Sequence, residues 1–119
     1  MKDEKDLRLR TKMFARRIIR LYCALPKGDA AAQVLGKQVL RSGTSIGANY
    51  REAQRARSKA EFISKIGDCL KEADETCYWL ELLLEENFVT AKRLQPLLDE
   101  ANELLAILTT ISKRSKGLE

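Results

Sequence analysis

The chain of 119 residues contains no histidine, and this absence excludes several kinds of chemistry at once. Histidine is the most frequent general base in enzymes, a common metal ligand and the side chain that titrates near neutral pH. Di-metal sites in helical bundles also need Glu-x-x-His pairs, which this sequence cannot supply. The sequence therefore predicts a protein that is not an enzyme and that uses no metal or other cofactor.

Cysteine is scarce as well, and its distribution gives no sign of a zinc site or a redox motif. The chain has three cysteines, Cys23, Cys69 and Cys77, with no C-x-x-C spacing among them. A zinc site needs more ligands than these residues provide. Because their neighbours are apolar, we expect all three to be buried, reduced thiols that pack as small hydrophobic residues.

Long hydrophobic runs are absent. No segment approaches the roughly 20 apolar residues that a transmembrane helix needs. The N-terminal segment, residues 1–10, is charged throughout and is not followed by the apolar core of a signal peptide. We therefore expect a soluble, cytoplasmic protein with no membrane partner.

What the sequence does contain is helical periodicity. Apolar residues recur at steps of three and four through four segments, which is the pattern of amphipathic helices. Six glycines and two prolines leave little material for anything beyond three short connections. We expect one domain over residues 1–119, with helices at about 4–24, 30–55, 59–86 and 91–113. The predicted fold is an all-α, antiparallel, up-down-up-down four-helix bundle.

Helix-end signals separate the first three segments. Pro26 and Gly28 are suited to end the first helix, and Asp29 is suited to cap the second. Ser58 and Glu61 have the spacing of a capping box for the third helix. These signals predict short connections and hence antiparallel neighbours.

Pro96 leaves two alternatives for the start of the fourth helix. Thr90 can cap a helix from position 91, in which case the first turns contain a proline and are kinked. The other alternative is a helix that begins near Gln95 after a short turn.

The second helix differs from the others because its most regular stripe is polar. Beside this stripe lie Gly43 and Gly47, each of which costs a helix about 1 kcal/mol relative to alanine, so we expect close approach by another helix. One alternative places the stripe in solvent. Short amides and hydroxyls in place of lysine and glutamate favour an oligomer interface or a buried polar network, and we prefer the interface. The residues concerned are Gln38, Ser42, Gly43, Ser45, Ile46, Asn49, Tyr50 and Glu52.

Several of these segments together resemble a known bacterial family. They are Leu25-Pro26-Lys27, residues 38–49, Glu52, residues 58–62, residues 71–76 and residues 78–82. They are similar to the signature of a four-helix-bundle family named for open reading frames in 23S rRNA intervening sequences. The resemblance implies a ring-like homopentamer and kinship with the accessory variability determinant of diversity-generating retroelements, a bundle that binds nucleic acid and a reverse transcriptase. The partners that it implies are therefore further copies of this chain, RNA or DNA, and a protein such as a reverse transcriptase.

Charge is distributed unequally among the expected helices. Residues 1–28 carry nine basic and three acidic residues, and residues 29–59 carry six and two, which gives net charges of +6 and +4. Residues 60–89 carry two basic and eight acidic residues, a net charge of −6. The basic residues concentrate on the first helix and around the turn after the second, at Arg8, Lys12, Arg16, Arg17, Arg20, Arg51, Arg55, Arg57 and Lys59.

Two hypotheses account for this asymmetry. In the first, the basic residues bind the phosphates of RNA or DNA without strong sequence specificity, since no base-reading motif occurs. In the second, the basic helices pair with the acidic third helix, and the protein is a structural or adaptor oligomer that acts through protein contacts. The asymmetry as a whole favours nucleic-acid binding by a non-catalytic oligomer.

Overall fold

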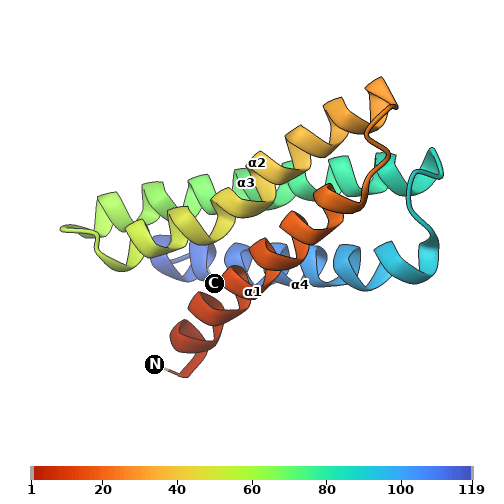
Figure 1. Ribbon diagram of the computed structural model, residues 1–119. Coiled ribbons are helices and arrows are strands. Elements are labelled where there is room, and N and C mark those ends of the chain that lie inside the picture. Colours follow the sequence, from red (N-terminus) through yellow and green to blue (C-terminus); the bar gives the residue numbers. More distant parts are fainter. Residues whose placement is uncertain (1, 119) are drawn as a thin grey trace.

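The computed structural model describes the backbone of residues 2–118 and the side chains of residues 7–118. Within this part of the chain there are four helices and no strand. The helices are α1 (Lys2–Ala24), α2 (Ala30–Gln54), α3 (Lys59–Glu85) and α4 (Ala91–Lys116). Successive helices run in opposite directions through short connections (Figure 1). The all-α prediction is confirmed, and each helix begins and ends within three residues of the expected position.

The helices follow one another around the bundle, so that each packs mainly against its neighbours in sequence. α2 packs against both α1 and α3, α3 packs against α4, and α1 meets α4 only sparsely. α1 runs obliquely to α4 in Figure 1. The backbones of α1 and α3 do not approach each other. The most basic and the most acidic helices are therefore kept apart.

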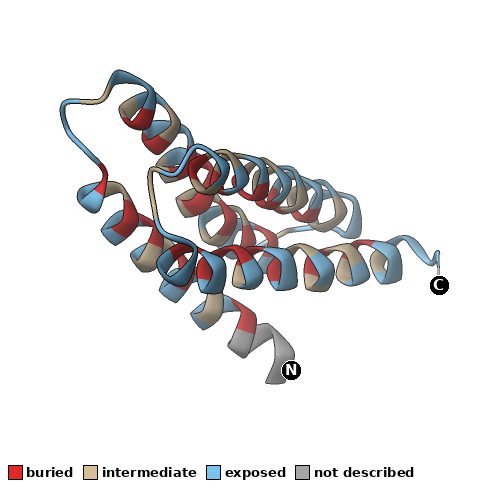
Figure 2. Ribbon diagram, turned by 90° about the vertical axis from the view of Figure 1, so that its right-hand side faces the viewer, coloured by how far each residue is buried: buried red, intermediate tan, exposed pale blue. Residues whose placement is uncertain are grey.

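The core is a single apolar interior to which every helix contributes one stripe (Figure 2). The molecule measures 46 × 22 × 21 Å, so it is slightly longer than α3, whose 27 residues span about 40 Å at 1.5 Å per residue. The largest fully buried side chains are Leu7, Phe14, Ile18, Val39, Ile46, Tyr50, Ile66, Leu80, Leu83, Leu94, Leu104 and Leu108. No helix in the described part of the chain is long and apolar enough to cross a membrane.

The expectation of three buried thiols is wrong for one of them. Cys69 and Cys77 are buried, but Cys23 is exposed. Cys23 lies two residues from both Leu21 and Leu25, which face the core, and two residues turn a helix by about 200°. The apolar neighbours of Cys23 therefore face the interior while the thiol faces solvent. Burial raises the pKa of Cys69 to about 12 and the pKa of Cys77 to about 11.

The expected capping residues are found, with one difference in geometry. Asp29 accepts a hydrogen bond from the backbone N–H of Ala32 at 2.9 Å. Ser58 accepts one from the N–H of Glu61 at 3.0 Å. The carboxylate of Glu61, however, accepts from the N–H of Arg57 at 3.2 Å, one residue before the position of a standard capping box. Ser58 and Glu61 therefore also hydrogen-bond the end of the connection between α2 and α3 to the first turn of α3.

The fourth helix contains its proline. Thr90 caps α4, which begins at Ala91, so Pro96 lies in the second turn. The alternative in which the helix begins near Gln95 is therefore wrong. Because proline has no N–H, the carbonyl of Lys92 receives no hydrogen bond from the usual helical donor.

Candidate nucleic-acid interface

The close approach predicted for the second helix is confirmed, and the approaching helix is α1 of the same chain. A Cβ atom placed on Gly43 would lie 2.8 Å from Cγ1 of Ile18, and one placed on Gly47 would lie 3.1 Å from Oγ1 of Thr11. Only glycine leaves room for these neighbours without displacement. The small residues of α2 thus bring the basic sides of the two helices together.

The polar stripe occupies the opposite flank of α2, toward α3. Ser42 is buried, and its hydroxyl lies 2.9 Å from that of Thr76 in a hydrogen bond between the two helices. Cys69 of α3 also contacts α2, with its thiol donating to the carbonyl oxygen of Ile46 at 3.7 Å. Near the C-terminal end of α2, Glu52 forms an ion pair with Lys65 of α3.

Four members of the expected interface are therefore interior residues of one chain. Ser42, Gly43, Ile46 and Tyr50 are all buried. They need no second subunit to cover them, because α1 and α3 already do so, and we withdraw the interface hypothesis for these four. The remaining members lie further around α2, with Ser45 and Asn49 half-buried and Gln38 and Glu52 exposed.

A groove of about 500 Å³ lies between α1 and α2 and collects residues from both predicted basic clusters. Arg8 and Lys12 line it from α1, and Arg51 and Arg55 line it from α2. Most of the other lining residues have small side chains, among them Ala15, Gly47 and Ala48. The close approach of the two helices at Gly47 places the basic residues of α1 near those of α2. Two groups of residues more than 38 positions apart in the sequence thus form one basic surface.

The charge of this groove is not neutralised from within. In the described part of the chain, none of the four basic residues forms an ion pair. The acidic residue that lines the groove, Glu52, has its Oε1 atom 3.0 Å from Nζ of Lys65 on α3. The hydrogen bond from Lys65 to Glu52 raises the pKa of Lys65 above its ordinary value. Lys65 therefore offsets the charge of Glu52, and the described residues that line the groove carry a net positive charge.

Five of the nine predicted basic residues lie outside the groove. Arg57 and Lys59 are exposed in and beside the connection from α2 to α3. Arg16 is exposed on the outward face of α1. Arg17 and Arg20 line a separate hollow between α1 and α4.

That hollow contains a basic residue which the sequence analysis did not single out. Arg93, on the first turn of α4, lines it together with the two arginines of α1. The segment that contains Arg93 has a net charge of only +1, so a count of charge along the chain gives no signal. Only the return of α4 beside α1 brings Arg93 to this position.

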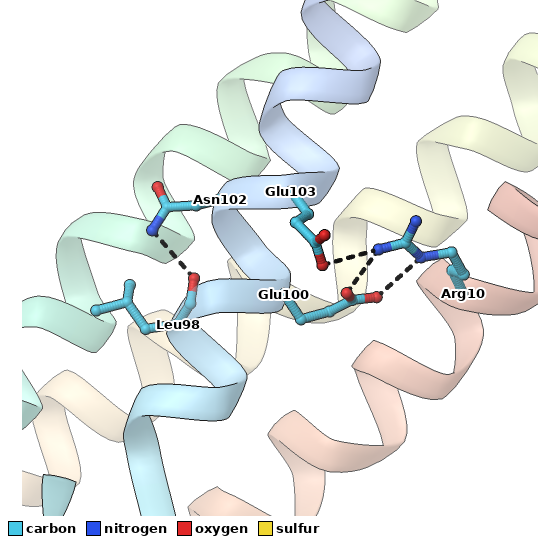
Figure 3. A network of polar contacts seen from close by, with 5 residues as sticks. All are labelled: Arg10, Leu98, Glu100, Asn102 and Glu103. Atoms are coloured by element: carbon cyan, nitrogen blue, oxygen red, sulfur yellow. Dashed lines mark hydrogen bonds and ion pairs between the residues drawn. The ribbon is translucent and has the colours of Figure 1, made fainter.

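In the described part of the chain, the basic helices interact little with the acidic α3: burial raises the pKa of Glu72 on α3, and the charge of Arg41 on α2 opposes this rise without cancelling it. The ion pair between α2 and α3 has its carboxylate on α2 and its lysine on α3. Arg10 of α1 pairs instead with α4, at 2.7 Å from Glu100 and 3.3 Å from Glu103 (Figure 3). Burial acts to raise the pKa of Glu100, but the hydrogen bonds and charge of Arg10 outweigh it and hold that pKa below its ordinary value.

The side chains of the groove are suited to binding anions. Guanidinium and ammonium groups donate several hydrogen bonds each and stay charged at neutral pH. Among the described residues, no group of three or more cysteine or acidic side chains is placed to hold a metal ion. The chemistry that this surface offers is the recognition of phosphate or carboxylate.

Comparison with known proteins relates most of the chain to one family. The family model described as 23S rRNA-intervening sequence protein matches residues 5–110. A crystal structure from Bacteroides thetaiotaomicron VPI-5482, described as a protein with unknown function from the S23 ribosomal protein family, is 43% identical and superimposes with a TM-score of 0.84, covering 90% of this chain and 98% of that one. No curated protein is significantly similar. The resemblance found in the sequence motifs is confirmed, and the chain belongs to the 23S rRNA-intervening sequence protein family.

Proposed function

We propose that this protein is a non-catalytic, oligomeric helical bundle that binds the sugar-phosphate backbone of RNA or DNA in the groove between α1 and α2. The observation that carries the proposal is the convergence of Arg8, Lys12, Arg51 and Arg55 on one groove, with no ion pair to any of the four among the described side chains. Each of these groups can replace a counterion on a phosphate, and counterion release is the main source of non-specific affinity.

The lining of the groove also supports binding without strong sequence specificity. Between the basic residues lie Ala15, Gly47 and Ala48, which have no side-chain donor or acceptor for a base edge. The hydroxyl of Thr44 is 2.7 Å from the carbonyl oxygen of Leu40 and is engaged by its own helix. Contacts to phosphate position a protein on nucleic acid, whereas base-edge contacts specify sequence.

We further propose that the chain assembles into a ring-like homopentamer, which presents the groove five times to one nucleic acid. One supporting observation is a second stripe on α1, directed outward. Leu9 is 60% exposed and Met13 is 41% exposed, and Arg16 follows at the same helical spacing. One face of α1 already packs in the core of its own chain, so exposed apolar residues on the opposite face are suited to contact a second subunit.

The complementary surface lies on α3. Tyr78 is 56% exposed and stands edge-on to the ring of Trp79, with the ring centroids 5.0 Å apart. Nε1 of Trp79 and Oε2 of Glu72 are shielded from solvent and have no hydrogen-bond partner in the described part of the chain. Because α1 and α3 do not meet within one chain, the basic stripe of one copy can face the acidic, aromatic surface of the next. Such a head-to-tail contact closes into a ring when its rotation permits.

The nucleic-acid proposal is tested by the salt dependence of binding to a labelled duplex, measured by fluorescence anisotropy. Four phosphate contacts in each groove predict a slope of about −3.6 per engaged groove for log K against log salt concentration, and the double variant Arg51→Gln/Arg55→Gln should halve the slope whatever the number of grooves engaged. The matched control, Arg57→Gln/Lys59→Gln, removes the same charge outside the groove and should change the slope by less than half as much. No binding at about 50 mM salt, or equal effects of the two double variants, would contradict the proposal.

The assembly is tested by mixing two variants whose defects lie on opposite surfaces. Met13→Glu/Arg16→Glu damages the α1 stripe. Glu75 lies on α3 three residues before Tyr78 and is therefore beside it on the helix surface, so Glu75→Lys/Tyr78→Ala damages the α3 surface. Each variant alone should be a monomer by light scattering, whereas an equimolar mixture should form a one-to-one dimer through the intact surfaces. If both variants keep the mass of the unmodified protein, these surfaces do not hold the oligomer together.

A second candidate is an adaptor that acts only through protein contacts, and the same α3 surface favours it. Tyr78 is exposed there beside the ring of Trp79, and tyrosine and tryptophan are enriched where proteins bind one another. Loss of a partner protein from variants of Tyr78, combined with absent binding of nucleic acid, would favour the adaptor over the nucleic-acid proposal.

A further inference from the structure

A second basic site lies on the other flank of α1 and differs in character from the groove. A hollow of about 210 Å³ between α1 and α4 is lined by Arg17, Arg20 and Arg93, with Leu21 and Leu97 beside them. Three guanidinium groups from two helices thus surround one small space. None of the three forms an ion pair in the described part of the chain.

The hollow lacks the carboxylate that would balance these arginines. No acidic residue is among those that line it, in contrast to the groove between α1 and α2, which contains Glu52. The carboxylate that interacts with Arg17 is Glu100, and it is already bound by Arg10, with N–O distances of 2.7 and 3.1 Å. Glu100 therefore makes its direct contacts with Arg10 (Figure 3) and acts on Arg17 only through its charge, so that no carboxylate among the described residues contacts the three arginines of the hollow.

An apolar hollow continues from the arginines. It has a volume of about 190 Å³ and shares Leu21 and Arg93 with the first, so the two spaces adjoin. Its other lining residues include Ala24, Phe88 and Val89, which offer an apolar surface. The first turn of α4 borders it, and the N-terminal end of a helix carries a partial positive charge. The combined site therefore has a cationic end and a second end where apolar residues line the hollow together with Thr90.

We infer that this pair of hollows binds a phosphomonoester, with the phosphate held by Arg17, Arg20 and Arg93 and the attached nucleoside against the apolar residues. A phosphomonoester carries a charge of about −1.5 to −2 at neutral pH, whereas each phosphodiester of a nucleic-acid backbone carries one negative charge. One guanidinium group can donate two parallel hydrogen bonds to two oxygens of the same phosphate. Three arginines are therefore suited to a phosphomonoester, which has three free oxygens. The ligand is either a free nucleotide or the 5′-phosphorylated end of a strand, and only the second source rests on the proposed function.

The site itself is tested with small probes and the full chain. Isothermal titration with adenosine 5′-monophosphate and with inorganic phosphate should show binding of both, with the nucleotide bound more tightly because it also fills the apolar hollow. Arg93→Gln should weaken the nucleotide about tenfold or more, which corresponds to the loss of a charge-assisted contact. The control Lys92→Gln removes the same charge from the adjacent, exposed residue and should leave the affinity unchanged. Absence of nucleotide binding, or an equal loss in the two variants, would overturn the inference.

The two sources are distinguished with one oligonucleotide prepared with and without a 5′-phosphate. If strand ends are the ligand, the phosphorylated strand should bind about tenfold more tightly, and Arg93→Gln should abolish this preference while leaving the affinity for the unphosphorylated strand unchanged. Arg55→Gln, in the groove, should weaken both strands and keep their ratio. Equal affinity of the two strands, with nucleotide binding retained, assigns the site to free nucleotides. If neither strand binds, the proposed function fails, and the nucleotide titration still decides whether the phosphomonoester site exists.

Discussion

The contact between Gly43 and Ile18 makes a prediction in which one substitution has opposite effects in two backgrounds. Gly43→Ala adds a Cβ atom that would lie 2.8 Å from Cγ1, 3.0 Å from Cγ2 and 3.2 Å from Cδ1 of Ile18. Ile18 is fully buried, and a β-branched side chain in a helix has one strongly preferred rotamer. The isoleucine therefore cannot turn away, and the two helices must separate.

The magnitude follows from two opposing terms. Replacing glycine by alanine inside a helix stabilises the fold by about 1 kcal/mol through helix propensity. Overpacking a close-packed interior costs about 1–3 kcal/mol. We expect a net loss of about 1 kcal/mol in the free energy of unfolding for Gly43→Ala. The matched control is Gly67→Ala on α3, where an added Cβ atom meets nothing within 4 Å, and it should gain about 1 kcal/mol.

The Ile18→Ala background reverses the sign. This substitution alone should cost about 2–5 kcal/mol, because it leaves a cavity against α2. In its presence the new methyl group of Gly43→Ala has room, so the helix-propensity term acts unopposed and the double variant should be about 1 kcal/mol more stable than Ile18→Ala. The assay is urea unfolding followed by far-ultraviolet circular dichroism, at one protein concentration for all variants because self-association would shift the equilibrium. The reasoning is refuted if Gly43→Ala stabilises the unmodified protein as much as Gly67→Ala does.

Three further predictions concern buried polar groups and thiols. Thr76→Val should cost about 1–3 kcal/mol because it leaves the Ser42 hydroxyl without its partner, and adding Ser42→Ala should recover most of the loss in urea unfolding; additive losses would contradict this. Near pH 8 a thiol reagent should modify Cys23 alone until the chain unfolds, and rapid modification of all three thiols would refute the assigned burial. Because burial raises the pKa of Cys69 to about 12 and of Cys77 to about 11 from 9.0, the unfolded chain loses these protons first. The stability that the thiols contribute is therefore full below about pH 9 and should fall as the pH rises toward 12, a trend that unfolding of a Cys69→Ala/Cys77→Ala variant should show less steeply.

The fold was largely predictable from the sequence because its signals are local. Apolar spacing of three and four residues identifies a helix without knowledge of its neighbours, and the caps at Asp29, Ser58 and Thr90 need only the next turn of chain. The sequence left the effect of Pro96 open, because a proline in the second turn is tolerated or not according to the packing of the rest of the helix. Cys23 was misassigned because its apolar neighbours face the core and it does not.

The candidate site was predictable in part, for the same physical reason. The basic character of α1 and of the end of α2 can be counted from the sequence. The glycines within α2 also predict that another helix packs closely at Gly43. The identity of the neighbouring helix depends on the tertiary structure, because a glycine in a helix allows close packing by a helix of the same chain or of a second subunit equally well.

The sequence by itself determined four helices, their ends apart from the start of α4, the charge of each and the family to which the chain belongs. The tertiary structure alone decided which charges act together. It joins Arg8 and Lys12 with Arg51 and Arg55 across the glycine contact, and it brings Arg93 beside α1 from the far end of the chain. Charge summed along a segment cannot show this, because an electrostatic site depends on distances in space, and those are set by helix packing.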